Sequence, residues 1–149
     1  MTAPRGIRNN NPGNIRWAKN VTSNFKGCVG KDDKGFCLFD TAENGIRAAA
    51  KVLLTYQRKH GVNTIRKAIT RWAPPADNND TAAYCRAVAR NVACGIDEEL
   101  EFSDPSILYR LVSAIIKHEN GQQPYHGAQL VAGIASALGV KPKAVSDVA

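Results

Sequence analysis

The sequence predicts a mainly α-helical protein with one small hairpin near its N-terminus. From Thr41 onward, apolar residues recur every three or four positions, whereas residues 1–40 are rich in Asn, Gly and turn signals. A length of 149 residues with 44% hydrophobic content fits one globular domain. We therefore expect a single domain over 1–149, with a loop and hairpin region at 1–40, a helical core at 41–139 and a tail at 140–149.

The N-terminal region contains the only segment that we expect to form a sheet. Cys28 and Cys37 flank the turn-rich stretch VGKDDKGF, which predicts a hairpin that brings the two cysteines opposite one another. Asp40 and Glu43 then fit the start of the first long helix. One apolar face of that helix consists of Ile46, Ala49, Leu53 and Tyr56.

Four further helices are marked by apolar periodicity between residues that start or stop a helix. The first of them spans Thr64 to Trp72 and must stop there, because two consecutive prolines follow and clash with a continuing helix. The other three lie between capping residues and glycines. Their start and end residues are Thr81 with Gly95, Asp104 with Gly121, and Gly139 at the end of the last helix.

The helix that follows Asp104 ends in a carboxyl group on its apolar side. Glu119 continues, by a step of four residues, the stripe of Leu108, Leu111, Val112, Ile115 and Ile116. Apolar surroundings and the negative end of the helix dipole both disfavour a carboxylate, and a general acid must keep its proton. Glu119 is therefore a candidate general acid of a glycosidase. The alternative is a helix-end Glu that turns into solvent or pairs with Lys117 or His118.

Four segments resemble known cell-wall hydrolases. A-I-I-K-H-E-N-G-Q-Q-P-Y, at 114–125, resembles the active-site segment of lysozymes and lytic transglycosylases, where the Glu protonates the glycosidic oxygen. R-G-I-R-N-N-N-P-G-N-I-R at 5–16, F-D-T-A-E-N-G-I-R at 39–47 and R-W-A-P-P at 71–75 resemble phage-associated and secretion-effector wall hydrolases. The resemblance implies a lysozyme-like helical domain in permuted order, because the hairpin here precedes the helix of Glu119.

The resemblance also implies the function. It predicts a muramidase that cleaves the β-1,4 glycan strands of bacterial peptidoglycan with Glu119 as general acid. A lytic transglycosylase with the same acid is an alternative, and a non-catalytic wall-binding or virion structural module is an alternative of another class. The segment departs from many relatives in one position, since it has Asn120 where they have Ser.

Residues that contact the sugar are expected near Glu119. The side-chain amides of Asn11 and Asn14 can donate to and accept from sugar hydroxyl and N-acetyl groups, although Asn-Pro-Gly-Asn is also a strong turn signal. Tyr125 is close to Glu119 in sequence and can stack on a sugar face, although large aromatic residues at helix ends often belong to the core.

A second catalytic carboxylate is not decided by the sequence. The candidates in the hairpin region are Asp32, Asp33 and Asp40, each of which can equally serve a turn or a helix cap. No cofactor and no metal are expected, because the three histidines lack the spacing of a metal site.

The four cysteines allow two disulfides or four free thiols. Cys28 and Cys37 can bridge the hairpin. Cys85 and Cys94 can pair only if their helix ends before Cys94, because nine helical residues would separate them by about 13.5 Å. Disulfides would indicate an oxidising compartment.

Charge and location complete the sequence-based expectations. A net charge of +7 favours a polyanionic partner, and without a nucleic-acid-binding signature the expected partner is peptidoglycan rather than nucleic acid. No stretch reaches the roughly 20 apolar residues of a membrane span, and the first residues lack the apolar core of a signal peptide. We expect a monomer that acts in the periplasm or cell wall, delivered by a phage or a secretion apparatus. A secreted effector would also require an immunity protein.

Overall fold

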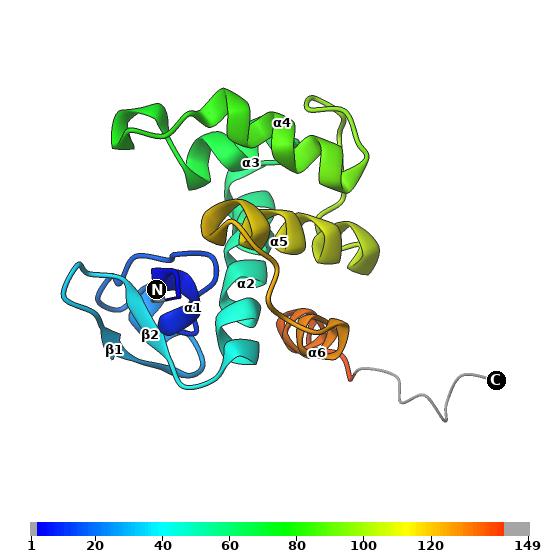
Figure 1. Ribbon diagram of the computed structural model, residues 1–149. Helices are drawn as coiled ribbons and strands as arrows, with labels where there is room; N and C mark the ends of the chain where they lie inside the picture. The colour runs from blue at the N-terminus through cyan, green and yellow to red at the C-terminus, as the bar shows by residue number, and fades with distance from the viewer. Residues whose placement is uncertain (1–2, 142–149) are drawn as a thin grey trace.

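Helices make up most of residues 3–141, which are the residues that the computed structural model describes (Figure 1). An antiparallel hairpin of two strands lies near the N-terminus, so the predicted mainly helical class is confirmed. In chain order the elements are α1 (Arg5–Arg8), the short 3-10 helix η1 (Thr22–Asn24), β1 (Cys28–Lys31), β2 (Cys37–Phe39), α2 (Ala42–His60), α3 (Ile65–Trp72), the short 3-10 helix η2 (Pro75–Asp77), α4 (Thr81–Val92), α5 (Pro105–Asn120) and α6 (Gly127–Leu138).

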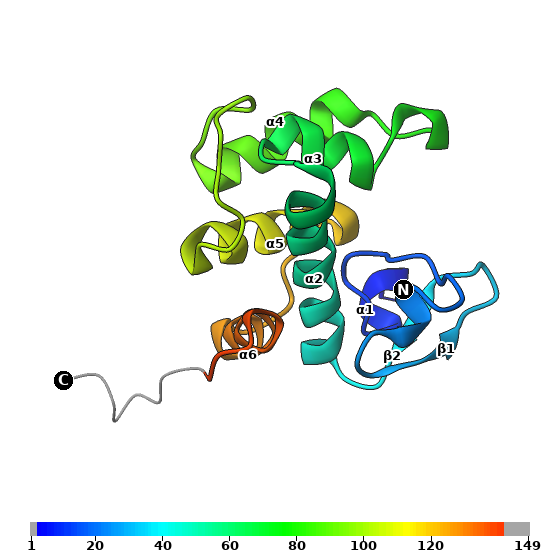
Figure 2. The same cartoon turned by 180° about the vertical axis from the view of Figure 1, so that it is seen from behind.

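Helix α2 runs through the middle of the molecule, and the other parts are arranged around it (Figures 1 and 2). Helix α6 packs near its N-terminal end, α5 crosses beside it, and α3 and α4 lie at its C-terminal end. Residues 3–40, which we call the N-terminal lobe, lie on one side of α2. The helices share one large core, and the lobe has a small core of its own around Ile15, Cys37, Phe39 and Ala48.

Two helix boundaries differ from the sequence-based expectation. Asp80, and not Thr81, caps α4, because the Asp80 side chain accepts from the Ala83 N–H while the Thr81 hydroxyl donates to the Ala73 carbonyl. The same helix ends at Val92, before Gly95, because Ala93 takes a left-handed conformation with φ 62°. The first difference arises because the Thr81 hydroxyl is used outside the helix, and the second is a change of backbone conformation at Ala93.

The remaining helix ends follow the predicted signals closely. Thr41 caps α2 by accepting from the Asn44 N–H at 3.1 Å, one residue after Asp40. Asp104 caps α5, and Gly121 ends that helix in the left-handed region at φ 69°. No helix among residues 3–141 combines the length and the apolar character needed to span a membrane. The predicted tail lies outside the described residues from position 142 onward.

Gly45 lets the N-terminal lobe approach α2 closely. A Cβ atom built at this position would collide with the carbonyl oxygen of Asn10, which is backbone and cannot rotate away. On the other side of α2, the absence of a side chain at Gly133 lets α6 approach Ile46 of α2 in a similar way. Glycine at position 45 is thus required for the position of the lobe.

Substituting Gly45 by Ala is expected to destabilise the protein by at least about 2 kcal/mol, because the added methyl must push the backbone of the lobe away from α2. Urea unfolding of the purified protein measures this change. Gly95→Ala is the matched control, since the nearest atom to its new Cβ, the Glu98 Cβ, lies at 3.6 Å. We expect the control to change stability by less than about 1 kcal/mol. Equal midpoints for the two variants would contradict the proposed role of Gly45.

Candidate active site

The side chain of Asn11 stabilises the loop at residues 9–14 through hydrogen bonds. The Asn11 amide nitrogen donates to the carbonyl oxygens of Ile15 and Cys37, at 2.9 and 3.1 Å, and its oxygen accepts from the Ile15 N–H at 3.0 Å. Its side chain is fully buried, so these bonds replace water. The predicted contact between Asn11 and a substrate is therefore wrong: Asn11 holds the loop against β2.

Asn14 reaches from the same loop to the end of α5. Its Nδ2 donates to Oε1 of Glu119 at 3.0 Å, across 105 positions of sequence. Asn14 has a φ of 50°, in the left-handed region that Asn tolerates better than most residues. Asn120 fastens the same junction, because its buried amide donates to the carbonyls of Pro12 and Ile116, both at 2.9 Å. The loop and the end of α5 therefore form one unit.

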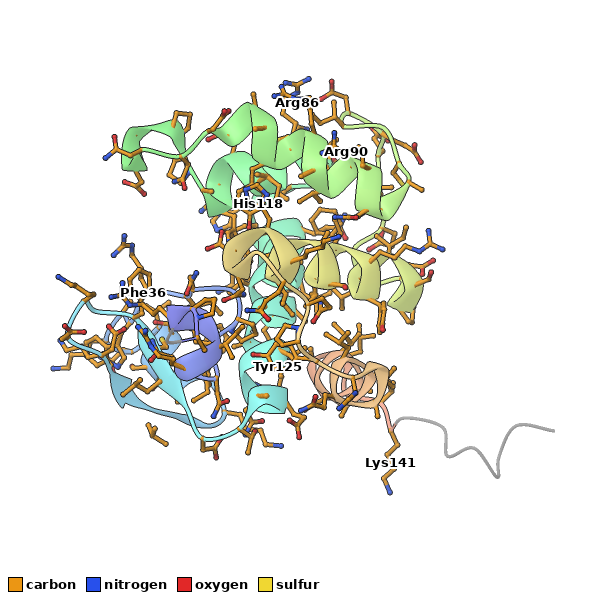
Figure 3. The ribbon with its side chains drawn as sticks, in the orientation of Figure 1. Phe36, Arg86, Arg90, His118, Tyr125 and Lys141 are labelled. Carbon is orange, nitrogen blue, oxygen red and sulfur yellow. The ribbon has the colours of Figure 1, made fainter. Side chains whose placement is uncertain are left out.

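Glu119 is half-buried and lines a hollow of about 310 Å³, which we call the Glu119 hollow. It lies between the end of α5 and the start of α4, where Figure 3 shows His118 pointing toward α4. The other lining residues are Asn79, Asp80, Ala83, Tyr84 and His118. The sequence predicts an acid at the end of an apolar helix, and in the structure that residue, Glu119, faces a cavity and not solvent alone.

Tyr84 forms an aromatic wall of the Glu119 hollow. Its ring stacks on His118, with centroids 3.8 Å apart and planes inclined by 27°. Only 2% of the residue is exposed, and its hydroxyl lies close to the Glu119 carboxyl group. Burial raises the pKa of Tyr84, and the nearby Glu119 carboxylate raises it further. Tyr84 is therefore a neutral hydroxyl beside the acid.

A larger groove of about 730 Å³ lies between the N-terminal lobe, the C-terminal end of α2 and the segment after α3. We call it the Trp72 groove, because Trp72 forms part of its wall, edge-on to Tyr56 with ring centroids 6.2 Å apart. Gly13 of the lobe lies directly on Trp72, since a Cβ there would be 2.8 Å from the indole ring. The volume is within the range of ligand-binding clefts.

The Trp72 groove and the Glu119 hollow adjoin one another, and we call the two together the cleft. Asn14 lines the groove and donates to Glu119, which lines the hollow. The segment 74–80 borders both, with Pro74 and Asp77 on the groove and Asp80 on the hollow.

Tyr125 lies outside this cleft. It packs against the helical core on the connection between α5 and α6 (Figure 3), and it lines neither the groove nor the hollow. Burial raises the pKa of Tyr125, and the nearby Glu43 raises it further. The structure therefore does not support the predicted stacking of Tyr125 on a substrate sugar.

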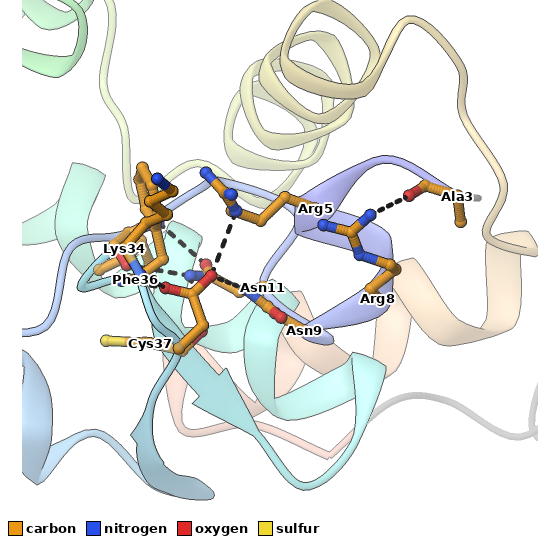
Figure 4. Close-up of polar contacts among 10 residues, drawn as sticks. Ala3, Arg5, Arg8, Asn9, Asn11, Lys34, Phe36 and Cys37 are labelled. Atoms are coloured by element: carbon orange, nitrogen blue, oxygen red, sulfur yellow. Dashed lines mark hydrogen bonds and ion pairs between the residues drawn. The ribbon is translucent and has the colours of Figure 1, made fainter. Parts of the chain in front are cut away.

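Asp32 serves the lobe and not the hollow. Figure 4 shows Arg5 and Asn9 converging on the hairpin turn, where Arg5 Nε lies 3.2 Å and Asn9 Nδ2 2.9 Å from the second carboxylate oxygen of Asp32. The first oxygen accepts from the N–H groups of Lys34 and Phe36, both at 2.9 Å. Burial acts to raise the pKa of Asp32, but these hydrogen bonds and Arg5 hold it below its ordinary value.

The other predicted candidates for a second carboxylate are also away from Glu119. Asp33 is exposed in the hairpin, and Asp40 accepts from the Asn44 side chain at 2.9 Å. The acidic residue that shares the hollow with Glu119 is Asp80. Sequence reasoning missed it, because an Asp at a helix start is most simply a cap, and nothing local connects it with Glu119.

All four cysteines are free thiols, so neither predicted disulfide is present. In the hairpin Cys28 pairs with Phe39 and Cys37 with Lys31, so the two residues are not register partners, although their thiols are close to one another. Burial, with a contribution from the neighbouring Cys28, raises the pKa of Cys37 to about 11. Helix α4 does end before Cys94, but Cys85 remains a buried thiol of the core. Within residues 3–141, no three His, Cys, Asp or Glu side chains are grouped to hold a metal ion.

The amino-acid sequence is similar to that of a phage protein. No protein-family model matches the sequence. Protein P5 of Pseudoalteromonas phage PM2 is 40% identical over 124 residues, which are 83% of this chain and 75% of the phage protein.

Proposed function

This chain belongs to the family of Protein P5 of Pseudoalteromonas phage PM2, and we propose that it is a glycosidase that cleaves the β-1,4 glycan strands of bacterial peptidoglycan. The observation that carries the proposal is the position of Glu119. It stands at the end of α5, in a hollow that adjoins the larger Trp72 groove, and Asn14 donates a hydrogen bond to its carboxyl group. A relative from a phage is consistent with an enzyme that acts on the bacterial cell wall.

Glu119 acts as the general acid in this proposal. It stands at the C-terminal end of α5 and lines the hollow. Asn14 donates to Oε1, which leaves Oε2 as the oxygen that would carry the transferable proton. The neutral Tyr84 beside it adds no charge.

Asp80 completes the reaction as the second carboxylate. It stands at the N-terminal end of α4, and its carboxylate accepts from the Ala83 N–H at 3.1 Å. Two carboxyl groups that line one hollow fit a general acid and a general base. As Glu119 protonates the leaving oxygen and the C1–O bond breaks, a water attacks C1 and gives its proton to Asp80. The hollow of about 310 Å³ has room for that water, which occupies about 30 Å³ in the liquid.

Digestion of purified peptidoglycan tests this function. We expect the protein to clear a suspension of sacculi and to release fragments with reducing ends, as read by mass spectrometry. Fragments lighter by one water would carry anhydro ends and would show a lytic transglycosylase instead. Binding without any clearing would contradict an enzymatic role and favour a non-catalytic wall-binding module.

A further inference from the structure

The Trp72 groove carries positive charges that have no acidic partner. Arg16, Lys59 and Arg71 line it, and all three are exposed. The ion pairs within residues 3–141 join Arg5 to Asp32 and Arg66 to Asp97, so none of these three cations is neutralised. The other ionisable lining residues are Tyr56, His60 and the acidic Asp77, and burial raises the pKa of Tyr56, so the groove is net positive at neutral pH.

Two of these cations lie over aromatic rings. The Arg71 guanidinium lies over the ring of Tyr56, 5.3 Å from its centroid, and Tyr56 itself packs on Trp72. The Arg16 guanidinium lies over Phe36 at 4.8 Å. A guanidinium that lies over a ring can still donate its N–H groups, whose fork matches the two oxygens of a carboxylate. The groove therefore has two guanidinium groups that aromatic contacts help to position.

Apolar side chains lie beside these donors. Ile15, Val52 and Trp72 line the same groove, and a sugar ring has apolar faces that pack against such surfaces. The groove meets Glu119 at Asn14, so a strand whose glycosidic bond is at Glu119 extends its neighbouring residues past the cations.

We propose that the Trp72 groove is an anion subsite for the carboxylates that substituents of a glycan strand carry, and that it makes the enzyme prefer acidic strands to neutral ones. The inference rests on the proposed function for the orientation of the strand. In peptidoglycan two sources share this chemistry: the lactyl carboxylate of muramoyl sugars that carry no stem, and the carboxylates of the peptide stem where one is attached.

Binding, and not cleavage, tests the subsite. Titration calorimetry on Glu119→Gln protein, which retains the groove, uses soluble peptidoglycan fragments in three forms. One is untreated and carries stem carboxylates, one is treated with an amidase that removes the stems and frees the lactyl carboxylates, and one is coupled with methylamine through a carbodiimide so that all carboxylates become neutral amides. We expect the untreated form to bind about tenfold more tightly than the neutral form. Equally tight binding of the amidase-treated form shows that a carboxylate on the lactyl group satisfies the subsite, and its absence assigns the anion to the stem.

Matched variants locate the effect in the groove. Arg71→Gln is expected to remove most of the preference for acidic fragments, and Lys59→Gln provides a second test if the first variant has a lowered melting temperature. Arg90→Gln changes the net charge equally, but Arg90 lies exposed on α4 and lines neither part of the cleft (Figure 3). The Arg90→Gln protein should therefore prefer acidic fragments as strongly as the Glu119→Gln parent does.

Three results would overturn the subsite: equal binding of acidic and neutral fragments, equal losses in Arg71→Gln and Arg90→Gln, or tighter binding of a single-stranded oligonucleotide than of any fragment. Because the readout is binding, these results are independent of lysis. Wild-type protein that fails to clear sacculi would contradict the proposed function, and a persisting preference for acidic fragments would then still identify an anion site.

Discussion

Replacing Glu119 by Gln is expected to lower the rate of peptidoglycan clearing by about 10²- to 10⁴-fold, the range for loss of a general acid. The glutamine oxygen can still accept from Asn14, so the junction between the loop and α5 is retained. The change removes only the transferable proton. Initial clearing rates and thermal melts of the two proteins measure the effect.

Glu99→Gln is the control for this experiment. Glu99 is exposed between α4 and α5 and lines neither the hollow nor the groove, so the same chemical change should leave the rate at the wild-type value. Clearing that persists in Glu119→Gln with an unchanged melt would remove Glu119 from the mechanism.

The second large effect is expected at Asp80. Asp80→Asn should reduce the hydrolytic rate by about 10²-fold or more, because the amide cannot take a proton from the attacking water. Asn is as good a helix cap as Asp, so the stability of α4 should be retained. A base that activates water also predicts inversion at C1, which NMR of freshly formed reducing ends can detect.

Asp33→Asn is matched to this variant, since it removes the same charge from an exposed position of the hairpin. Its rate should equal that of the wild type. Retention of configuration at C1, or an Asp80→Asn protein as active as Asp33→Asn, would show that Asp80 is not the base.

The helical framework was predictable from short windows of sequence. The apolar stripe, the Asp104 cap and the Gly121 terminator of α5 all lie within a few residues of the structure that they specify. The same holds for the stop of α3 before the prolines and for the hairpin between Cys28 and Cys37. Glu119 could be identified as a candidate acid in this way, because its place at the end of an apolar helix is a local property.

The surroundings of Glu119 were not predictable in this way. Asn11 and Asn14 lie in the same loop, yet one is buried within it and the other reaches Glu119. Asp80 and Tyr84 join the hollow only because α4 packs against α5. Tyr125, six residues from Glu119 in sequence, packs in the core instead.

Sequence by itself determined the helices, their caps and the position of an acid at a helix end, whereas the tertiary structure decided which side chains that acid meets. Helix periodicity and capping depend on hydrogen bonds and contacts within about four residues. The contact between Asn14 and Glu119 joins positions 105 residues apart. It depends on Gly45, which lets the lobe pack closely on α2, and on Asn120, which binds the loop to the end of α5. No short window of sequence contains these packing contacts, because each needs two distant segments to be folded before it can form.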